Sequence, residues 1–332
     1  LALGAARRLS PRPAAALLLG ALALDLGLTA LPAVRTSPLP LLEAPPLVAA
    51  LDPRPGAPPP RYFSRGRLRA PLAPTGPDGV TPGERDEALA RDVLEGSRAL
   101  PHGVRAIDAF ETVHAAAFDR LARDPRLAAL PAPERWGRLD AAWLPAGPAE
   151  VTRAGGAFAP RGEVLPGLLL VENLACPPWA YLVAAAAPAR DVEAAIAATC
   201  AAGRRPDHLV VLGPEGLEVA ERTSPPGPGG EVLGVDVAPE RLVVRVRAAG
   251  PAWLVVREAY SRDWVATVDG APVVTARADV LFRAVAVPPG EHEVVMVHAP
   301  AWWAPGLALA ALGWAGLAAL GVRGCLGPRR GA

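Results

Sequence analysis

Three residues near the end of the chain, Tyr260, Trp264 and Arg283, have side chains that can recognise a sugar. Aromatic faces pack on the C–H surfaces of pyranose rings, so Tyr260 and Trp264 can form a stacking platform. The guanidinium of Arg283 can bind a phosphate or a carboxylate through two parallel hydrogen bonds. A structural interpretation stays open for all three. Aromatic residues in strands commonly belong to a core, and Arg283 can pair with Asp279 or Asp263 across a sheet.

The segment that carries these residues is patterned as β-structure. Asp269-Gly270 is a two-residue hairpin signal, and Pro288-Pro289-Gly290 predicts a second turn. Short strands at such spacing predict an antiparallel β-sandwich over residues 231–299. The expected strands are Glu231–Val237, Leu242–Ala248, Trp253–Glu258, Trp264–Val268, Pro272–Ala276, Leu281–Val287 and Glu293–Val297.

Upstream of the Pro- and Gly-rich linker 224–230, helical and strand patterns alternate, which predicts an α+β domain over residues 61–223. Helices are expected at Glu84–Leu94, Asp108–Leu121 and Val192–Ala201, with a short helix and then a strand within Arg135–Leu144. Strands are expected at Arg61–Arg69, Leu168–Glu172, Ala180–Ala184 and His208–Leu212. Residues 32–60 are Pro-rich and are expected to form an extended connection.

Two uncharged or nearly uncharged runs, 13–31 and 300–322, are predicted to be transmembrane helices, because about 20 apolar residues can span a bilayer. A signal peptide is the alternative for 13–31. Arginines in the flank 1–12 and in the tail 323–332 place both termini in the cytoplasm. The sequence therefore predicts a membrane protein fragment, in which two transmembrane helices flank an extracytoplasmic α+β region and an antiparallel β-sandwich. The lipid bilayer is its first expected partner.

Other chemistry receives little support from the sequence. The formal net charge is +1, and no basic patch with interleaved aromatics occurs, so nucleic-acid binding is not expected. The five histidines are scattered and no Cys/His cluster has zinc-ligand spacing, so neither a metal site nor a cofactor is expected. Cys176 and Cys200 can form a disulfide in an oxidising compartment or remain two small buried thiols.

Two strings of the C-terminal part resemble a family pattern. Val256–Val273 (VREAYSRDWVATVDGAPV) is similar to Y-x-x-G-W-x-x-x-V-D-G, and Ala278–Val294 (ADVLFRAVAVPPGEHEV) is similar to N-x-L-F-R-A-V-x-V-P-x-G-x-H-x-V. Upstream, Leu169–Val183 (LLVENLACPPWAYLV) resembles V-x-E-N-x-x-A-x-P-R-A-x-x-V. These patterns are those of the YfhO-type bacterial membrane proteins. Gly103–Phe110 (GVRAIDAF) weakly resembles a further pattern of the family, G-x-x-x-x-x-G-Y, with Phe110 in place of its Tyr. The chain departs from the other patterns at Trp179, Asp263 and Asp279, where they have Arg, Gly and Asn.

This resemblance implies the C-terminal portion of an integral protein of the bacterial cell membrane, in the C-type glycosyltransferase superfamily. It implies transfer of a sugar from a polyprenyl-phosphate donor to an envelope glycan acceptor. Members of that superfamily carry their catalytic acid in an early outside loop, so the catalytic residues are expected to lie outside this chain and stay unknown. The alternative is a non-catalytic, membrane-anchored extracytoplasmic binding or scaffold module.

Overall fold

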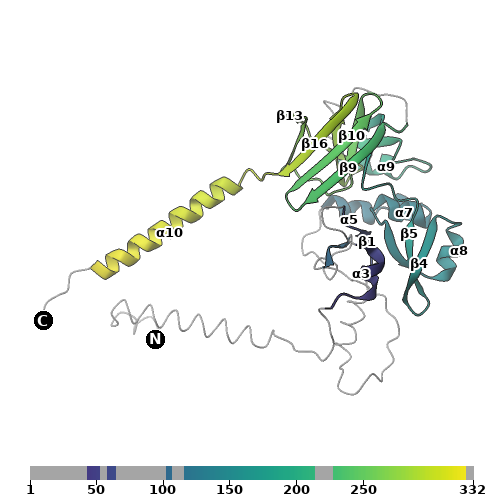
Figure 1. Ribbon diagram of the computed structural model, residues 1–332, viewed down its shortest axis with the longest axis horizontal. Coiled ribbons are helices and arrows are strands. Elements are labelled where there is room, and N and C mark those ends of the chain that lie inside the picture. The colour runs from purple at the N-terminus through teal and green to yellow at the C-terminus, as the bar shows by residue number, and fades with distance from the viewer. Residues whose placement is uncertain (1–42, 53–57, 65–101, 107–115, 214–226, 327–332) are drawn as a thin grey trace, which may run out of the picture. The chain divides into compact units, whose positions relative to one another are not determined.

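The computed structural model describes residues 43–52, 58–64, 102–106, 116–213 and 227–326, and the side chains within these ranges up to residue 316. The chain divides into two units. One consists of Leu41–Pro300, and the other combines Leu1–Pro40 with Ala301–Ala332. In the second unit the described element is the helix α10, Trp303–Leu326 (Figure 1). The predicted helix Glu84–Leu94 and the first predicted span, 13–31, lie outside the described residues.

The prediction of two transmembrane helices is contradicted. Among the described residues, no helix combines the length and the apolar character needed to cross a membrane. The second predicted span, 300–322, falls on α10, which has 24 residues. Half of its 24 residues are Ala or Gly, which gain less on transfer into hydrocarbon than its six leucines. The absence of charge in that run was therefore too weak a criterion for a span.

The N-terminal part of the larger unit is built on a mixed five-stranded sheet, here sheet B, with strand order β2-β1-β3-β5-β4. Its strands are β1 (Arg61–Tyr62), β2 (Arg105–Ala106), β3 (Trp143–Ala146), β4 (Phe158–Leu165) and β5 (Leu168–Asn173). The helices in this part are α3 (Pro46–Leu51), α5 (Ala116–Ala122), α6 (Pro125–Ala129), α7 (Ala132–Arg138) and α8 (Pro148–Arg153). Leu144, Phe158 and Val171 form a buried cluster against which Ala132 of α7 and Val151 of α8 pack.

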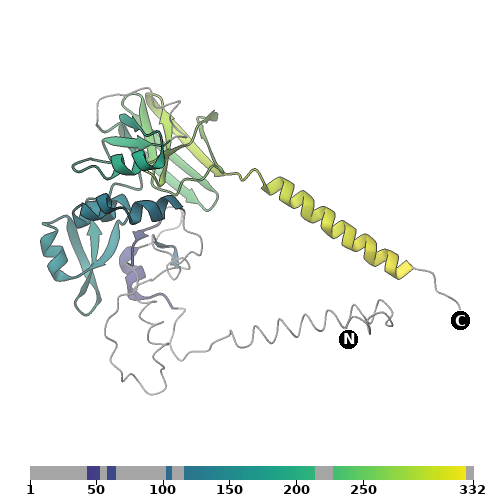
Figure 2. The same ribbon diagram turned by 180° about the vertical axis from the view of Figure 1, so that it is seen from behind.

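Two further sheets pack face to face (Figures 1 and 2). Sheet A has the order β13-β12-β16-β10-β9, and sheet C has the order β6-β11-β15-β14-β8-β7. Every pair in these sheets is antiparallel except β7 with β8. The strands are β6 (Ala180–Val183), β7 (Ala185–Pro188), β8 (Leu209–Leu212), β9 (Gly230–Ala238), β10 (Arg241–Ala248), β11 (Ala252–Val256), β12 (Trp264–Val268), β13 (Ala271–Val273), β14 (Ala276–Ala278), β15 (Phe282–Val287) and β16 (Gly290–His298).

The core between sheets A and C follows from alternation along the strands. In β10, Leu242, Val244 and Val246 are buried, while Arg245 and Arg247 are exposed. Successive side chains of a strand point to opposite faces, so the three apolar residues share one face. They pack with Leu254 of β11, Val285 of β15 and other residues of both sheets. Sheet A thus turns an apolar face to sheet C and an arginine-bearing face to solvent.

Sheet C joins residues from both sides of the predicted linker 224–230. Strand β6 pairs with β11, with Leu182 opposite Leu254, and β8 pairs with β14 through Leu212 and Ala278. Helix α9 (Val192–Thr199) begins at Asp191, whose side chain accepts a hydrogen bond from the Ala194 amide at 2.7 Å. Its residues Ala195 and Ile196 pack against Val211 of β8 in a cluster shared with α5 and α6. Residues 61–223 and 231–299 therefore contribute strands to one sheet.

The predicted hairpin forms between β12 and β13. Asp269 and Gly270 have φ of 51° and 82°, which is the left-handed pair that a type I′ turn requires. Asn, Asp and Gly tolerate this conformation best. Asp269 also accepts a hydrogen bond from the Glu293 amide at 2.9 Å, which ties the turn to β16.

Candidate functional site

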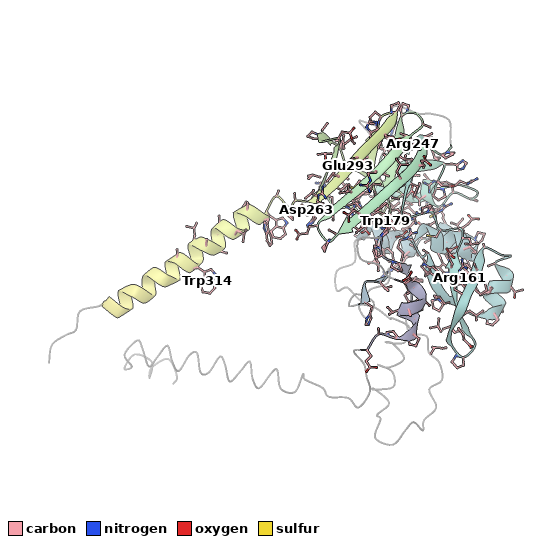
Figure 3. The ribbon with its side chains drawn as sticks, in the orientation of Figure 1. Arg161, Trp179, Arg247, Asp263, Glu293 and Trp314 are labelled. Atoms are coloured by element: carbon pink, nitrogen blue, oxygen red, sulfur yellow. The ribbon has the colours of Figure 1, made fainter. Side chains whose placement is uncertain are left out.

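A cavity of about 540 Å³ opens at one end of the core between sheets A and C. The strands β9 and β10 contribute Val237 and Leu242, while β12 and β15 contribute Trp264 and Arg283. Val104 and Arg105, at the start of β2 in sheet B, line the cavity as well. Trp179, which immediately precedes β6, lies at this end of the sheets in Figure 3, and Arg247 lies at the opposite end. The volume is typical of pockets that bind small molecules.

Arg283 is the most unusual residue of this cavity. Its side chain is 3% exposed, and its guanidinium lies 4.0 Å from the centroid of the Trp264 ring. Its nearest carboxylate oxygen, on Glu258, is 3.7 Å away. Its Nη1 is buried and has no hydrogen-bond partner within the described part of the chain. Burial, opposed by Glu258 and reinforced by Arg105, lowers the pKa of Arg283 to about 10. The cavity therefore contains a cation whose hydrogen-bonding capacity is only partly used.

Glu258 connects the other polar side chains of the cavity. Its Oε1 accepts hydrogen bonds from Arg105 Nη1 at 2.8 Å and from the indole Nε1 of Trp179 at 3.1 Å. These contacts fix the Trp179 ring and hold Arg105 at the cavity wall. Arg105 Nη1 also donates to the backbone carbonyl of Arg257 at 2.6 Å. Both donors bind Oε1, while Oε2, the Glu258 oxygen nearest Arg283, stays 3.7 Å from Arg283 Nη2, beyond hydrogen-bond distance.

A buried ion cluster joins sheet B to this end of the sandwich. The carboxylate of Asp140, which follows α7, contacts Arg61 of β1 and Arg257, which follows β11. Arg257 Nε donates to Asp140 Oδ1 at 2.5 Å, and Arg257 Nη2 donates to the carbonyl of Gly137 at 2.5 Å. Arg105 lies 3.7 Å from Asp140 Oδ2 and so links the cluster to the cavity. Four guanidinium groups, those of Arg61, Arg105, Arg257 and Arg283, share the two carboxylates Asp140 and Glu258.

The structure brings two of the three predicted site residues together. Trp264 and Arg283 both line the cavity, whereas Tyr260 stacks with the guanidinium of Arg277 at 4.4 Å and is not among the lining residues. The alternative partners predicted for Arg283 are used elsewhere. Asp279 pairs with Arg204, and Asp263 contacts Ser261 at 3.3 Å.

Three residues of the site were not predicted: Arg105, Trp179 and Glu258. Trp179 stands in the Leu169–Val183 string, at the position where the family pattern has Arg. Arg257 and Glu258 directly follow the apolar strand β11. A charged pair at the end of a buried strand is a sequence signal that could have identified Glu258. Arg105 comes from a segment with no local pattern that connects it to the sandwich.

The cavity combines apolar walls, two indole rings and excess positive charge. Trp179 and Trp264 offer surfaces for an apolar or carbohydrate face, and Arg283 offers a free donor for an oxyanion. In the described ranges, no group of three or more His, Cys, Asp or Glu side chains lies together in a way that could hold a metal ion. Cys176 and Cys200 are both free thiols, so the disulfide alternative is not formed.

Comparison with known proteins adds no family assignment. The chain matches no family model, no curated protein and no solved structure.

Proposed function

We propose that this chain is a binding module for an acidic saccharide, which it holds in the cavity at the end of the sandwich. The observation that carries the proposal is Arg283, a buried and incompletely paired guanidinium stacked on Trp264. A sugar ring fits the indole surfaces, and a carboxylate or phosphate on that sugar supplies the hydrogen-bond acceptor that Arg283 lacks. A cavity of about 540 Å³ accommodates such a ligand.

An anionic ligand is favoured over a neutral one by the electrostatics of the site. A buried charge is costly unless it is paired and hydrogen-bonded. Glu258 Oε1 accepts from Arg105 and Trp179, and Glu258 Oε2 stays 3.7 Å from Arg283 Nη2, beyond hydrogen-bond distance. A second oxyanion in the cavity would relieve this shortage of acceptors, whereas a neutral sugar would leave it in place.

The sugar transfer that the family resemblance implies stays a prediction. Its donor, a polyprenyl-phosphate sugar, and its envelope glycan acceptor both contain the chemistry that this cavity suits. The binding proposal concerns recognition, and it holds for a catalytic protein and for a non-catalytic module alike.

Titration calorimetry with glucuronate, galacturonate and glucose tests the proposal. We expect the two uronates to bind and glucose to bind at least about tenfold more weakly, because a hydrogen bond to a charged group contributes about 1.5–3 kcal/mol. Arg283→Gln should abolish the preference for uronates, and Trp264→Ala should weaken all three sugars.

A matched control is available on the same strand. Val265 follows Trp264 in β12, is 52% exposed and does not line the cavity. Val265→Ala should therefore leave binding unchanged. Equal affinity for glucuronate and glucose, or full uronate binding by the Arg283→Gln protein, would show that the cavity is not an acidic-saccharide site.

A further inference from the structure

A second cavity, of about 360 Å³, lies against the loop that precedes Trp179. This loop contributes Cys176, Pro177 and Pro178, and the opposite wall comes from α7 and from the turn that leads into β8. Two residues of those walls, Arg138 at the end of α7 and Arg204 in the turn, are buried cations. Buried cations such as these require hydrogen-bond acceptors.

Arg138 lacks a carboxylate partner. It is 4% exposed, and in the part of the chain that the structure describes it forms no ion pair. Its Nη2 donates to the backbone carbonyl of Arg204 at 2.7 Å, while its Nε is buried without a hydrogen-bond partner. Burial and the neighbouring Arg204 lower the pKa of Arg138. An arginine in this position costs stability unless something else pairs with it.

Arg204 is only partly satisfied. Its side chain is 5% exposed and pairs with Asp279, and its Nη2 also donates to the Leu209 carbonyl at 2.7 Å. Its Nε and Nη1 are buried and have no partner among the described residues. Asp279 Oδ1 is further occupied by the Val211 amide at 2.9 Å. Asp279 Oδ1 therefore serves the Arg204 guanidinium and a backbone amide, and Arg138 has no carboxylate of its own.

The remaining charges of the cavity do not correct this imbalance. Arg205 and Asp207 pair with each other at 2.7 Å and contribute no net charge. Glu134, one turn before Arg138 on α7, is half-buried and forms no ion pair with Arg138 in the described structure. The unsatisfied groups at the cavity are thus N–H donors of two arginines.

We propose that this second cavity binds an oxyanion of the phosphate class, held between Arg138 and Arg204. Tetrahedral oxyanions accept paired hydrogen bonds from guanidinium groups, and several such oxygens can satisfy Nε of both residues and Nη1 of Arg204 at once. The site is separate from the saccharide cavity and does not depend on the function proposed for it. The oxyanion can be free phosphate or sulfate, or the phosphate group of a sugar phosphate.

The test measures the melting temperature of the whole chain in phosphate, in sulfate and in glucose 1-phosphate, against chloride at equal ionic strength. At about ten times its dissociation constant, a ligand should raise the melting temperature by about 3–6 °C in a domain of this size. Arg138→Gln should abolish the rise. Arg247→Gln is the matched control, because Arg247 is an exposed arginine on β10 that pairs with Glu231 and Glu291. It should retain the full rise.

A second variant keeps the test decisive if Arg138→Gln fails to fold. Glu134→Gln removes a half-buried negative charge from the cavity wall and should tighten phosphate binding several-fold by lowering repulsion. A rise of equal size with phosphate and with glucose 1-phosphate identifies the phosphate group as the ligand, and a larger rise with the sugar phosphate identifies the ester. No rise in the wild-type chain, or the same rise in the Arg138→Gln and Arg247→Gln proteins, overturns the proposal.

Discussion

Arg257 directly follows β11 and Arg283 lies on the neighbouring strand β15, yet the two buried side chains differ in how completely they are paired. Both side chains are almost fully buried, at 1% and 3% exposure. Arg257 donates to Asp140 and to the Gly137 carbonyl at 2.5 Å and stacks over Phe282 at 4.2 Å. Arg283 Nε donates to the Glu258 carbonyl at 3.5 Å, its Nη2 lies 3.7 Å from the Glu258 carboxylate, and its guanidinium lies 4.0 Å from the Trp264 ring. One arginine is fully paired within the protein, and the other is not.

The pKa directions follow this difference. For Arg257 burial is the largest single influence and works against the charged form, but the combined contributions of Asp140, Cys176 and Tyr181 exceed it and the pKa is raised. For Arg283 burial prevails, and the pKa is lowered to about 10. The comparison separates a buried arginine that is paired within the protein from under-paired arginines at cavities, for which we propose ligands. Arg138 belongs with Arg283 in the second group.

Asp140→Asn should produce the largest loss of stability. The amide keeps the size of the carboxylate and tolerates the φ of 75° at this position, but it leaves Arg61 and Arg257 buried beside a neutral group. Removing one partner of a buried pair costs about 3–5 kcal/mol. Urea denaturation measures the change in the free energy of unfolding. A loss below about 1 kcal/mol would mean that the cluster is not structural.

Gly137→Ala should cause a smaller loss of stability than Asp140→Asn. It tests the hydrogen bond from Arg257 to the Gly137 carbonyl. A Cβ at this position would lie 2.9 Å from the Ala175 carbonyl oxygen, so α7 would have to move away from the loop 174–178. The Gly137 carbonyl would move with it and lose its geometry toward Arg257. We expect a loss of about 1–3 kcal/mol in urea denaturation. Ala154→Gly, after α8, is a control for a change of equal size away from the cluster.

Arg283→Gln should have the smallest effect on stability of the buried changes. The substitution removes a charge whose desolvation cost is offset by little pairing. The free energy of unfolding should therefore change by less than about 1 kcal/mol and can increase. Uronate binding should be lost in the same protein. A stability loss as large as that of Asp140→Asn would move Arg283 into the structural group and remove the basis of the saccharide site.

Local patterns predicted the positions of most strands in the sandwich. The alternation in Leu242–Ala248 corresponds to β10, and the Asp269-Gly270 signal corresponds to the turn after β12. Strand β4 was missed because Pro160 and Gly162 interrupt its pattern and half of its residues are exposed. Strand β7 was missed because Ala185–Pro188 consists of Ala and Pro, which carry no strand signal.

The site was predictable only in part, because its residues meet through long-range pairing. Trp264 and Arg283 were identified by residue type, and their contact arises where β12 of one sheet faces β15 of the other. Trp179 lines the same cavity because β6, the strand that follows it, pairs with β11. Strand β11 comes after the predicted linker 224–230 and after the strands β9 and β10. No local signal encodes that pairing. The span at 300–322 was predicted wrongly for the opposite reason, since a local property, absence of charge, was taken for strong hydrophobicity; the run 13–31 lies outside the described residues.

His292 and Asp269 form an ion pair that is only partly buried, with side chains 15% and 53% exposed. His292 Nδ1 and Asp269 Oδ2 lie 2.6 Å apart. The contact with Asp269 raises the pKa of His292 above its usual 6.5, and the contacts with His292 and with the Glu293 amide lower the pKa of Asp269 below 3.8. The raised histidine pKa gives stability that is complete below pH 6.5 and is lost as the pH rises through the folded-state value. The lowered aspartate pKa gives stability that is present above pH 3.8 and is lost as the pH falls through its folded-state value.

The pair should therefore stabilise the hairpin most between about pH 4 and pH 6.5. His292→Gln should lower the melting temperature slightly at pH ~5.5 and have little effect at pH ~8.5, because exposed ion pairs contribute little and the histidine is neutral there. Asp269→Asn keeps the turn geometry and should remove the same pH dependence. Melting curves of the three proteins across this range decide the matter. An effect of His292→Gln that grows with pH would contradict the assigned pairing, and an effect as large as that of Asp140→Asn would show that burial is not what separates structural charges from the rest.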